Sequence, residues 1–331
     1  MKTSKSPRKV MAEALAAAEA SLPLYAHRFA PKKFTQPQLF ACLVLKEFEK
    51  KDYRGVCALL ADCSDLRAVI GLKIVPHYTT LQKASVRLLH SKQVRRLLAQ
   101  TVRRIHRRRQ RVPYGAGDSS GFDAHHASRY FIIRSAKDKK DDKKAPKQRV
   151  SYKRYGKLMV IVCCLSHAIL AAVASAGPTP DIHQLDGVLA QLPADVRLRH
   201  LVLDAGFDSA HNHRLLREDN GIRSTIPPEY GRKPKDPDAL PPDKYRRLMK
   251  TRFNQKAYRK RPQVESVFSM LKRNLGSALR ARSHHGRRRD LLLRALTHNL
   301  MLALMQVFYR AGQESFRHSR LELIPDPLEL P

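Results

Sequence analysis

Acidic residues are scarce in this chain of 331 residues. It contains 29 aspartates and glutamates against 64 lysines and arginines, so its formal net charge at pH 7 is +35 and its pI is near 10.5. A compact chain with this much self-repulsion is best stabilised by a polyanion, and nucleic acid is the usual one. The composition therefore predicts contact with nucleic acid and does not point to a small-molecule substrate.

Cysteines and long apolar runs are also few. The five cysteines are odd in number, and none forms a Cys-x-x-Cys pair with a partner at zinc spacing. No apolar stretch reaches the roughly 18–20 residues that cross a bilayer, and the start of the chain lacks an apolar signal segment. We therefore expect a cytoplasmic location, no disulfide, no structural zinc and no membrane partner.

Residues 1–111 are predicted to be helical. Segments 9–20 and 38–50 are alanine-rich or carry apolar residues at three- and four-residue steps. Three short segments follow within residues 53–90, and they fit either a helix-turn-helix that enters a DNA groove or a bundle used for packing or dimerisation. The basic segment 92–111 is predicted to be a helix that follows a phosphate backbone or serves as a solvated linker. The sequence leaves both pairs of alternatives open.

Residues 112–312 have the pattern of a mixed α/β sheet flanked by helices. The elements expected are a Gly-broken strand, a hairpin of two apolar strands that breaks at Ser166-His167, and then helix, strand, helix and strand. Their ranges are 112–122, 157–166 and 168–177, then 181–192, 199–207, 209–220 and 222–227.

Other segments interrupt or close this sheet domain. The lysine-rich stretch 135–149 is expected to be a loop, either in contact with DNA or simply solvated. Residues 227–257 are rich in proline, lysine and arginine and predict an exposed insertion. One helix beginning near Pro262 and another over about 289–310 close the domain, and residues 313–331 are expected to form an irregular tail.

Two aspartates stand at the ends of predicted strands. Asp118 lies in the segment GDSSGF, and Asp204 lies in LVLDAGFDS directly after an apolar run. In α/β sheets, strand ends open onto the crevice where ligands bind. Turns also favour aspartate and glycine, so these two positions alone give only modest support for a metal site.

A third acid lies on a helix that carries other chemistry. In YRKRPQVESVFSMLK, Tyr258, Arg261, Glu265 and Lys272 are separated by three, four and seven residues. At 100° per residue these offsets fall within roughly 60° of one helical face. That face would carry an acid flanked by two cations and a phenol. The alternative is a surface helix with an ion pair between Arg261 and Glu265.

The spacing Y-x2-R-x3-E-x6-K, with GDSSGF and LVLDAGFDS before it, resembles the DDE transposases of bacterial insertion sequences, and in particular the group with a Tyr-Arg-Glu-Lys signature. The resemblance covers about residues 112–310. It implies a ribonuclease H-like core in which Asp118, Asp204 and Glu265 are catalytic and hold divalent metal. Ser120 departs from the threonine that relatives often have.

The resemblance also implies the remaining roles. Two Mg²⁺ ions, or Mn²⁺ in their place, would be bridged by Asp118, with Asp204 and Glu265 each completing one ion's ligands. Tyr258, Arg261 and Lys272 match the positions that contact the transposon end in the family. Their DNA partners would be the terminal inverted repeats and the target.

Handling two DNA ends together predicts a homodimer at synapsis, in association with the bacterial nucleoid. Two other functions stay open. One is a ribonuclease H-like nuclease or resolvase without strand transfer, and the other is a non-catalytic DNA-binding protein derived from a transposase.

Overall fold

The computed structural model describes residues 3–106, 111–124, 155–177, 179–229 and 240–321, with the backbone alone for residues 306–321. The lysine-rich segment 135–149 lies outside these residues, as does part of the insertion expected at 227–257. Within the described residues, no helix combines the length and apolarity needed to cross a membrane.

Six helices form the described part of the first 106 residues. Local hydrogen bonds fix their starts: the Ser6 hydroxyl accepts from the Lys9 backbone N–H at 3.4 Å, and Thr35 and Gln38 form a reciprocal capping box. The helices are α1 (Pro7–Glu19), α2 (Gln36–Phe48), α3 (Tyr53–Asp62), α4 (Ser64–Val69), α5 (Tyr78–Leu88) and α6 (Ser91–His106). The helical character predicted for this region is confirmed.

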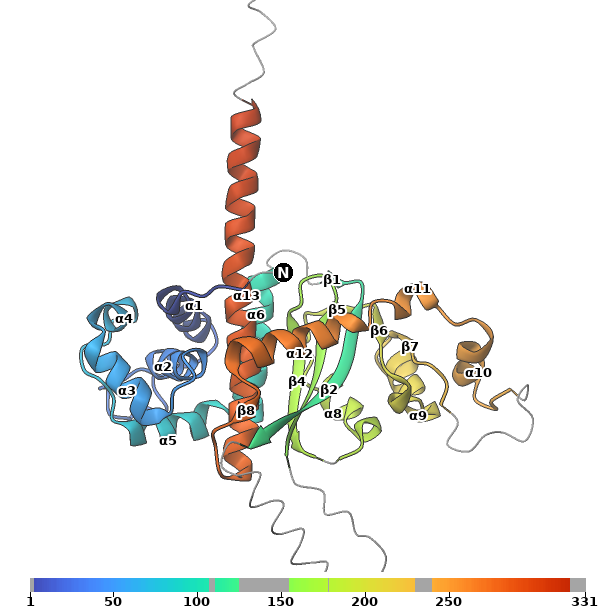
Figure 1. Cartoon of the computed structure of the whole chain (residues 1–331), viewed down its shortest axis with the longest axis horizontal. Helices are drawn as coiled ribbons and strands as arrows, with labels where there is room; N and C mark the ends of the chain where they lie inside the picture. The colour runs from blue at the N-terminus through green and yellow to red at the C-terminus, as the bar shows by residue number, and fades with distance from the viewer. Residues whose placement is uncertain (1–2, 107–110, 125–154, 178, 230–239, 322–331) are drawn as a thin grey trace, which may run out of the picture.

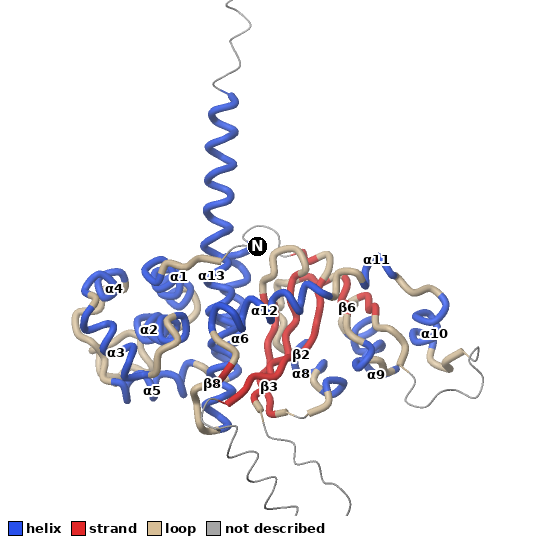
Figure 2. Tube along the Cα trace, in the orientation of Figure 1, coloured by secondary structure: helices blue, strands red, loops and turns tan. Residues whose placement is uncertain are grey.

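A mixed sheet occupies the centre of the molecule (Figure 2). Its main strands are β2 (Gly115–Ala124), β3 (Gly156–Cys163), β4 (Ile169–Ala176), β6 (His200–Val202) and β7 (Arg223–Thr225). The hydrogen-bonded order is β4-β3-β2-β6-β7: β4, β3 and β2 are antiparallel, whereas β2, β6 and β7 are parallel. The short strand β8 (Ala278–Leu279) pairs with β2, and β1 (Arg111–Val112) pairs with β5 (Arg197–Leu198). The predicted hairpin and mixed sheet are confirmed.

The other elements surround this sheet, with α12 lying across it in Figure 1. They are η1 (Asp181–His183), α8 (Leu185–Leu189), η2 (Ala205–Phe207), α9 (Ala210–Arg214), η3 (Leu215–Asp219), α10 (Lys244–Thr251), α11 (Gln255–Tyr258), α12 (Pro262–Leu275) and α13 (His284–Leu321).

Both faces of the sheet are covered because β3 is apolar on both sides. Successive side chains of a strand point to opposite faces. Accordingly, Val160 and Val162 pack in one cluster with residues of α12 and α13, whereas Met159 and Ile161 pack in another with residues of α8 and η3. All eight residues of β3 are buried, so this strand forms the centre of the fold.

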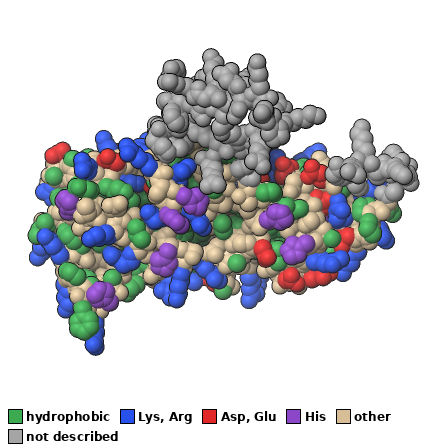
Figure 3. All heavy atoms as spheres, turned by 90° about the horizontal axis from the view of Figure 1, so that it is seen from below, with side chains coloured by type: hydrophobic (Ala, Val, Ile, Leu, Met, Phe, Trp, Pro, Cys, Tyr) green, Lys and Arg blue, Asp and Glu red, His purple; other side chains and the backbone are tan. Residues whose placement is uncertain are grey.

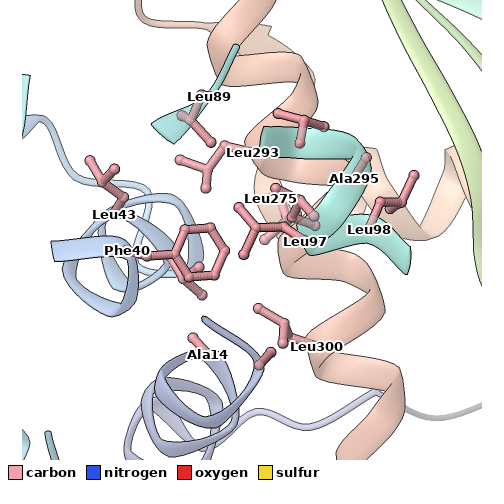
Figure 4. Packing of buried hydrophobic residues seen from close by; sticks show 14 of the residues in the cluster. Ala14, Phe40, Leu43, Leu89, Leu97, Leu98, Leu275, Leu293, Ala295 and Leu300 are labelled. Carbon is pink, nitrogen blue, oxygen red and sulfur yellow. The ribbon is translucent and has the colours of Figure 1, made fainter. Parts of the chain in front are cut away.

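One hydrophobic core joins the N-terminal helices to the sheet domain. Helix α13 contacts α1, α2 and α6 as well as β3 and β4. Figure 4 shows Phe40 of α2, Leu97 of α6 and Leu300 of α13 pointing toward one another, and all three are fully buried. Burial of each such side chain contributes about 1.5–3 kcal/mol. The boundary expected near residue 111 therefore lies inside one packed body.

A buried group of charges fixes α13 against α2. The Arg294 Nε donates to Glu47 at 2.7 Å, and the rest of this guanidinium donates to two backbone carbonyls near β8. Lys46 lies 3.2 Å from Glu47 and 3.5 Å from Asp290. Burial acts to raise the pKa of Glu47, but Lys46 and Arg294 hold it below its ordinary value. Glu47 is therefore a carboxylate inside the core.

Part of the insertion is anchored to the sheet domain through α10. This helix packs against α9, and its Met249 is buried. Arg246 donates to Asp208 at 2.8 Å and to the backbone carbonyl of Glu229 at 2.9 Å. Burial acts to raise the pKa of Asp208, but hydrogen bonds from His213 and Arg246 lower it. The loop that follows β6 is thus tied to α10 by a charged contact.

Helix α13 is longer at both ends than the sequence indicates, and the irregular tail expected from residue 313 is wrong up to Leu321. A single glycine such as Gly312 costs a helix only about 1 kcal/mol. No proline follows it until Pro325, so no strong helix breaker stands at this point.

The buried charges lead to a stability prediction. Arg294→Ala should lower the free energy of unfolding by about 3–5 kcal/mol, because it leaves Glu47 charged in the core without one of its two cationic partners, Lys46 being the other. Arg288→Ala, which removes an exposed arginine of the same helix, should change it by less than about 0.5 kcal/mol. Urea unfolding followed by circular dichroism measures both, and equal effects would contradict the account.

Candidate functional site

Parallel pairing of β2 with β6 sets the positions of two predicted acids. Ala116 of β2 is the register partner of Val202 of β6. Asp118 lies two residues beyond the first and Asp204 two residues beyond the second, in the same chain direction. The two aspartates therefore lie at the same level of neighbouring chain segments, and neighbouring strands lie about 4.8 Å apart. The structure brings them together.

Asp118 lies in a partly buried position among other acids. Its Oδ1 accepts the backbone N–H of Ser119 at 2.7 Å. Burial raises the pKa of Asp118 above its ordinary value, and the charges of Asp204 and Asp181 raise it further. The Ser119 N–H and the Arg261 guanidinium oppose this rise. Burial is the largest cause of the raised pKa, so an added positive charge beside the Asp118 carboxylate would be favourable.

Helix α12 presents the third acid. It begins at Pro262, as the sequence predicts, and Tyr258 ends the separate short helix α11. The helix contacts β2 and β3. Because the buried residues recur at three- and four-residue steps, the helix buries one side and leaves Glu265 exposed on another. The buried residues of this helix are Val264, Val267, Phe268, Met270, Leu271 and Leu275.

Arg261 connects two of the acids. Its Nε lies 3.5 Å from Asp204 Oδ1, and its Nη1 donates to Glu265 Oε1 at 2.5 Å. The Tyr258 hydroxyl also donates to Asp204 Oδ1, at 3.5 Å. Partial burial works to lower the pKa of Arg261, but the hydrogen bond with Tyr258 and the charges of Asp204 and Glu265 raise it. The ion pair that the sequence allows between Arg261 and Glu265 is present, and it extends to Asp204.

Lys272 connects the other half of α12 to β2. Its Nζ donates to Ser120 Oγ at 2.8 Å and lies 5.2 Å from the centre of the Phe122 ring. Ser120 is two residues along the same strand from Asp118. The helix face predicted from the spacing therefore does lie against the strands that carry the two aspartates.

The three acids are not gathered into one ligand set. Among the residues described here, no three histidine, cysteine, aspartate or glutamate side chains are arranged to hold one metal ion. Asp204 and Glu265 each contact Arg261, so a guanidinium lies where these two acids come nearest. Carboxylate oxygens are the ligands that Mg²⁺ prefers, so these residue types fit a metal ion. In this structure two of the carboxylates contact the Arg261 guanidinium instead.

A fourth acid, Asp181 of η1, lies near the site. In the structure it accepts the Ser119 hydroxyl at 2.6 Å and lies 2.7 Å from Lys157 Nζ. Its charge acts on Asp118 directly. No local pattern marks it, because Asp181 reaches the site only when η1 packs beside β2 and β3. Lys157 and Asp181 together are a neutral pair at the edge of the acidic cluster.

The raised pKa of Asp118 gives a second prediction. An acid whose pKa is higher in the folded chain costs stability once it ionises, so Asp118→Asn should raise the Tm by about 1–2 °C at pH 7.5 in EDTA. The gain should shrink as the pH falls and vanish well below about pH 3.9, the ordinary pKa of an aspartate, where the side chain is protonated in both states. Asp186→Asn, at an exposed position of α8, is the control. A lower Tm for Asp118→Asn at pH 7.5 would contradict the account.

Comparison with known proteins agrees with the fold. The family model described as the transposase DDE domain matches residues 115–300, which is more than half of the chain and runs from the start of β2 into α13. No curated protein matches the chain significantly. The matched range and the ribonuclease H-like sheet place this chain in the DDE transposase family.

Proposed function

We propose that this transposase binds the ends of a bacterial insertion sequence of the Tyr-Arg-Glu-Lys group and catalyses metal-dependent DNA cleavage and strand transfer. The observation that carries the proposal is the contact of Arg261 with both Asp204 and Glu265, on a helix that also contacts β2 beside Asp118. Three acids from distant parts of the chain and the cations between them then act on one phosphodiester.

Asp118, Asp204 and Glu265 are the residues that would hold Mg²⁺ or Mn²⁺. When bound, two such ions activate the attacking hydroxyl or water and stabilise the leaving oxygen. Asp118 is suited to this role, because the burial that raises its pKa makes an added positive charge favourable there. Glu265 is more than half exposed and reaches its partners through Arg261, so its side chain is free to turn once that ion pair opens.

Arg261, Lys272 and Tyr258 are proposed to hold the DNA end. Arg261 offers a planar group that can contact a phosphate with two N–H bonds. Lys272 offers a point charge beside Ser120, and Tyr258 a hydroxyl and a ring beside Asp204. DNA phosphate would then replace a carboxylate as the partner of Arg261. This exchange frees Asp204 and Glu265 for metal at the moment when the substrate arrives.

The charge of the surface supports DNA as the partner. On the face shown in Figure 3, lysine and arginine side chains are spread over most of the described surface, and acidic ones gather mainly toward the end that contains α9 and α10. With a net charge of +35 in the whole chain, this distribution favours a polyanion over a broad area.

Residues 1–111 are proposed to help recognise the terminal repeats or to form the homodimer at synapsis, and residues 112–312 to carry catalysis. Support for a DNA contact comes from α5, where Gln82, Lys83 and Val86 are exposed at positions that share a helical face while Leu81 and Leu88 are buried. A helix that is buried on one side and exposed on the other, with polar side chains such as Gln82 and Lys83, is the form that enters a DNA groove. We place the protein in the cytoplasm, on the nucleoid.

Removal of any one acid tests the catalytic assignment. Asp118→Asn, Asp204→Asn and Glu265→Gln should each leave DNA binding largely intact and reduce cleavage to below about one-hundredth of the wild-type rate, because each removes a metal ligand. The assay uses labelled duplexes that end in the inverted repeats flanking the coding region, with Mg²⁺ or Mn²⁺, and separates cut from joined products.

Asp186→Asn is the matched control and should cut at the wild-type rate. If one acid variant also cut at that rate, the residue that it replaces would not be a metal ligand. Cutting without any joined product would favour a nuclease or resolvase, and binding without metal-dependent cutting would favour a non-catalytic DNA-binding protein.

Lys272 gives a prediction about binding alone. Lys272→Ala should weaken binding to the same duplexes by about five- to tenfold and reduce the slope of log affinity against log salt by about 0.9, because one phosphate contact is lost. Arg273→Ala, on the same helix but exposed and bonded only to its own turn, should change both much less. An unchanged salt slope for Lys272→Ala would count against a phosphate contact.

A further inference from the structure

A cavity lies at the ends of the parallel strands that are opposite to the acids. It has a volume of about 400 Å³ and is open to solvent. Its lining comes from the chain just before β2, from β5 and the start of β6, and from the start of β7. The lining residues are Pro113, Tyr114, Leu198, Arg199, His200, Gly221 and Arg223. Neither the proposed metal ligands nor the residues assigned to the DNA end belong to this set.

The charge of the cavity has one sign. Arg199 and Arg223 are exposed at its rim, and their backbones are joined by a hydrogen bond of 3.0 Å. No acidic residue lines it, and within the described part of the chain neither arginine forms an ion pair. Lys260, next to Arg261 in sequence, lies 4.9 Å from the centre of the Tyr114 ring. The cavity therefore attracts an anion.

An aromatic pair forms one wall. The rings of Tyr114 and His200 are stacked, with centres 5.3 Å apart and planes 28° from parallel. A hydrogen bond of 2.8 Å to the Thr225 hydroxyl holds the histidine ring. Burial lowers the pKa of His200 to about 4, assisted by Arg217 and Arg223, so the ring is neutral at pH 7. A neutral aromatic wall beside two arginines suits a planar base attached to a phosphate.

The position of the cavity relates it to the catalytic acids. Tyr114 precedes Asp118 by four residues in nearly extended chain, and His200 precedes Asp204 by four. At about 3.3 Å per residue, the cavity lies roughly 13 Å from the acids along the strands. This separation is about four times the 3.4 Å rise of one strand in duplex DNA, so the cavity lies within reach of a DNA strand that occupies the site.

We infer that this cavity binds one nucleotide of a DNA strand that continues beyond the catalytic acids, with Arg199 and Arg223 on its phosphate and the Tyr114–His200 pair against its base. The inference rests on the proposed function in one respect: DNA must be the substrate. It adds a contact roughly 13 Å from the catalytic acids, and this contact reads no sequence because every base has a face that can stack.

The first experiment identifies the contact in the unaltered full-length chain. A 16-nucleotide oligothymidylate in which one thymidine is replaced by 5-iododeoxyuridine is irradiated with the protein, and the crosslinked peptide is identified by mass spectrometry. We expect the crosslink at Tyr114 or His200. Crosslinks that form only at other residues would overturn the inference.

The second experiment measures affinity with fluorescein-labelled 16-nucleotide oligothymidylate by anisotropy. The double variant R199Q/R223Q should bind about tenfold more weakly, with a salt slope lower by about 0.7 for the one phosphate released. The matched control R282Q/R288Q removes two exposed arginines beside the start of α13 and should keep the wild-type slope. Equal losses in both double variants would overturn the inference.

Substitutions of Tyr114 test the stacking contact separately from the charge contacts. Y114L should weaken binding about fivefold or more, whereas Y114F keeps the ring and should bind as the wild type does. The Tyr114 backbone carbonyl accepts from Cys164 N–H at 3.0 Å, and neither substitution removes this backbone contact, so the strand geometry should be retained. Equal affinity of Y114L and Y114F would overturn the stacking contact. Thymidine monophosphate bound as tightly as the 16-mer would overturn the assignment to a DNA strand.

These measurements need neither metal nor cleavage. Crosslinking at Tyr114 in a chain that never cuts DNA would support the cavity contact and contradict the proposed catalysis. A chain that binds and cuts the transposon ends normally and never crosslinks at Tyr114 or His200 would contradict the cavity contact alone.

Discussion

Parallel pairing of β2 with β6 is the constraint on which the rest of the site depends. It places Asp118 and Asp204 at one level of adjacent strands, although 85 residues lie between them in the chain. Burial of Asp118, together with the nearby negative charge of Asp204, makes its ionised form costly, and the pKa of Asp118 is raised accordingly. The fold tolerates the cost because β3 is buried on both sides and the shared core of α1, α2, α6 and α13 holds the sheet rigid.

The guanidinium of Arg261 partly offsets the repulsion between these acids. It contacts Asp204 and Glu265 and acts on the charge of Asp118 from a distance. We propose that a divalent metal and a DNA phosphate together offer the same charges in exchange: the metal would replace the guanidinium as the partner of the acids, and the phosphate would replace the acids as the partner of the guanidinium. Opening of these ion pairs would then be coupled to the arrival of the charged substrate.

The sequence predicts the local parts well, because those parts depend on local chemistry. The hairpin break at Ser166-His167, the start of α12 at Pro262 and the common face of Arg261 and Glu265 follow from spacing, proline geometry and helical period. Asp181 and the core shared across residue 111 could not be predicted, since they depend on how distant elements pack. The end of α13 was missed because one glycine is a weak stop signal. The assignment of the three acids as metal ligands stays a prediction.

The central claim is that Asp118, Asp204 and Glu265 converge on metal when Arg261 is released. The most direct measurement is a crystal structure of the protein with Mn²⁺ and a transposon-end duplex, with the ions located by their anomalous scattering. The account predicts manganese bound by oxygens of all three acids, with Arg261 on a DNA phosphate. Manganese bound without Glu265, or an Arg261 still paired with Glu265 beside bound metal, would contradict it.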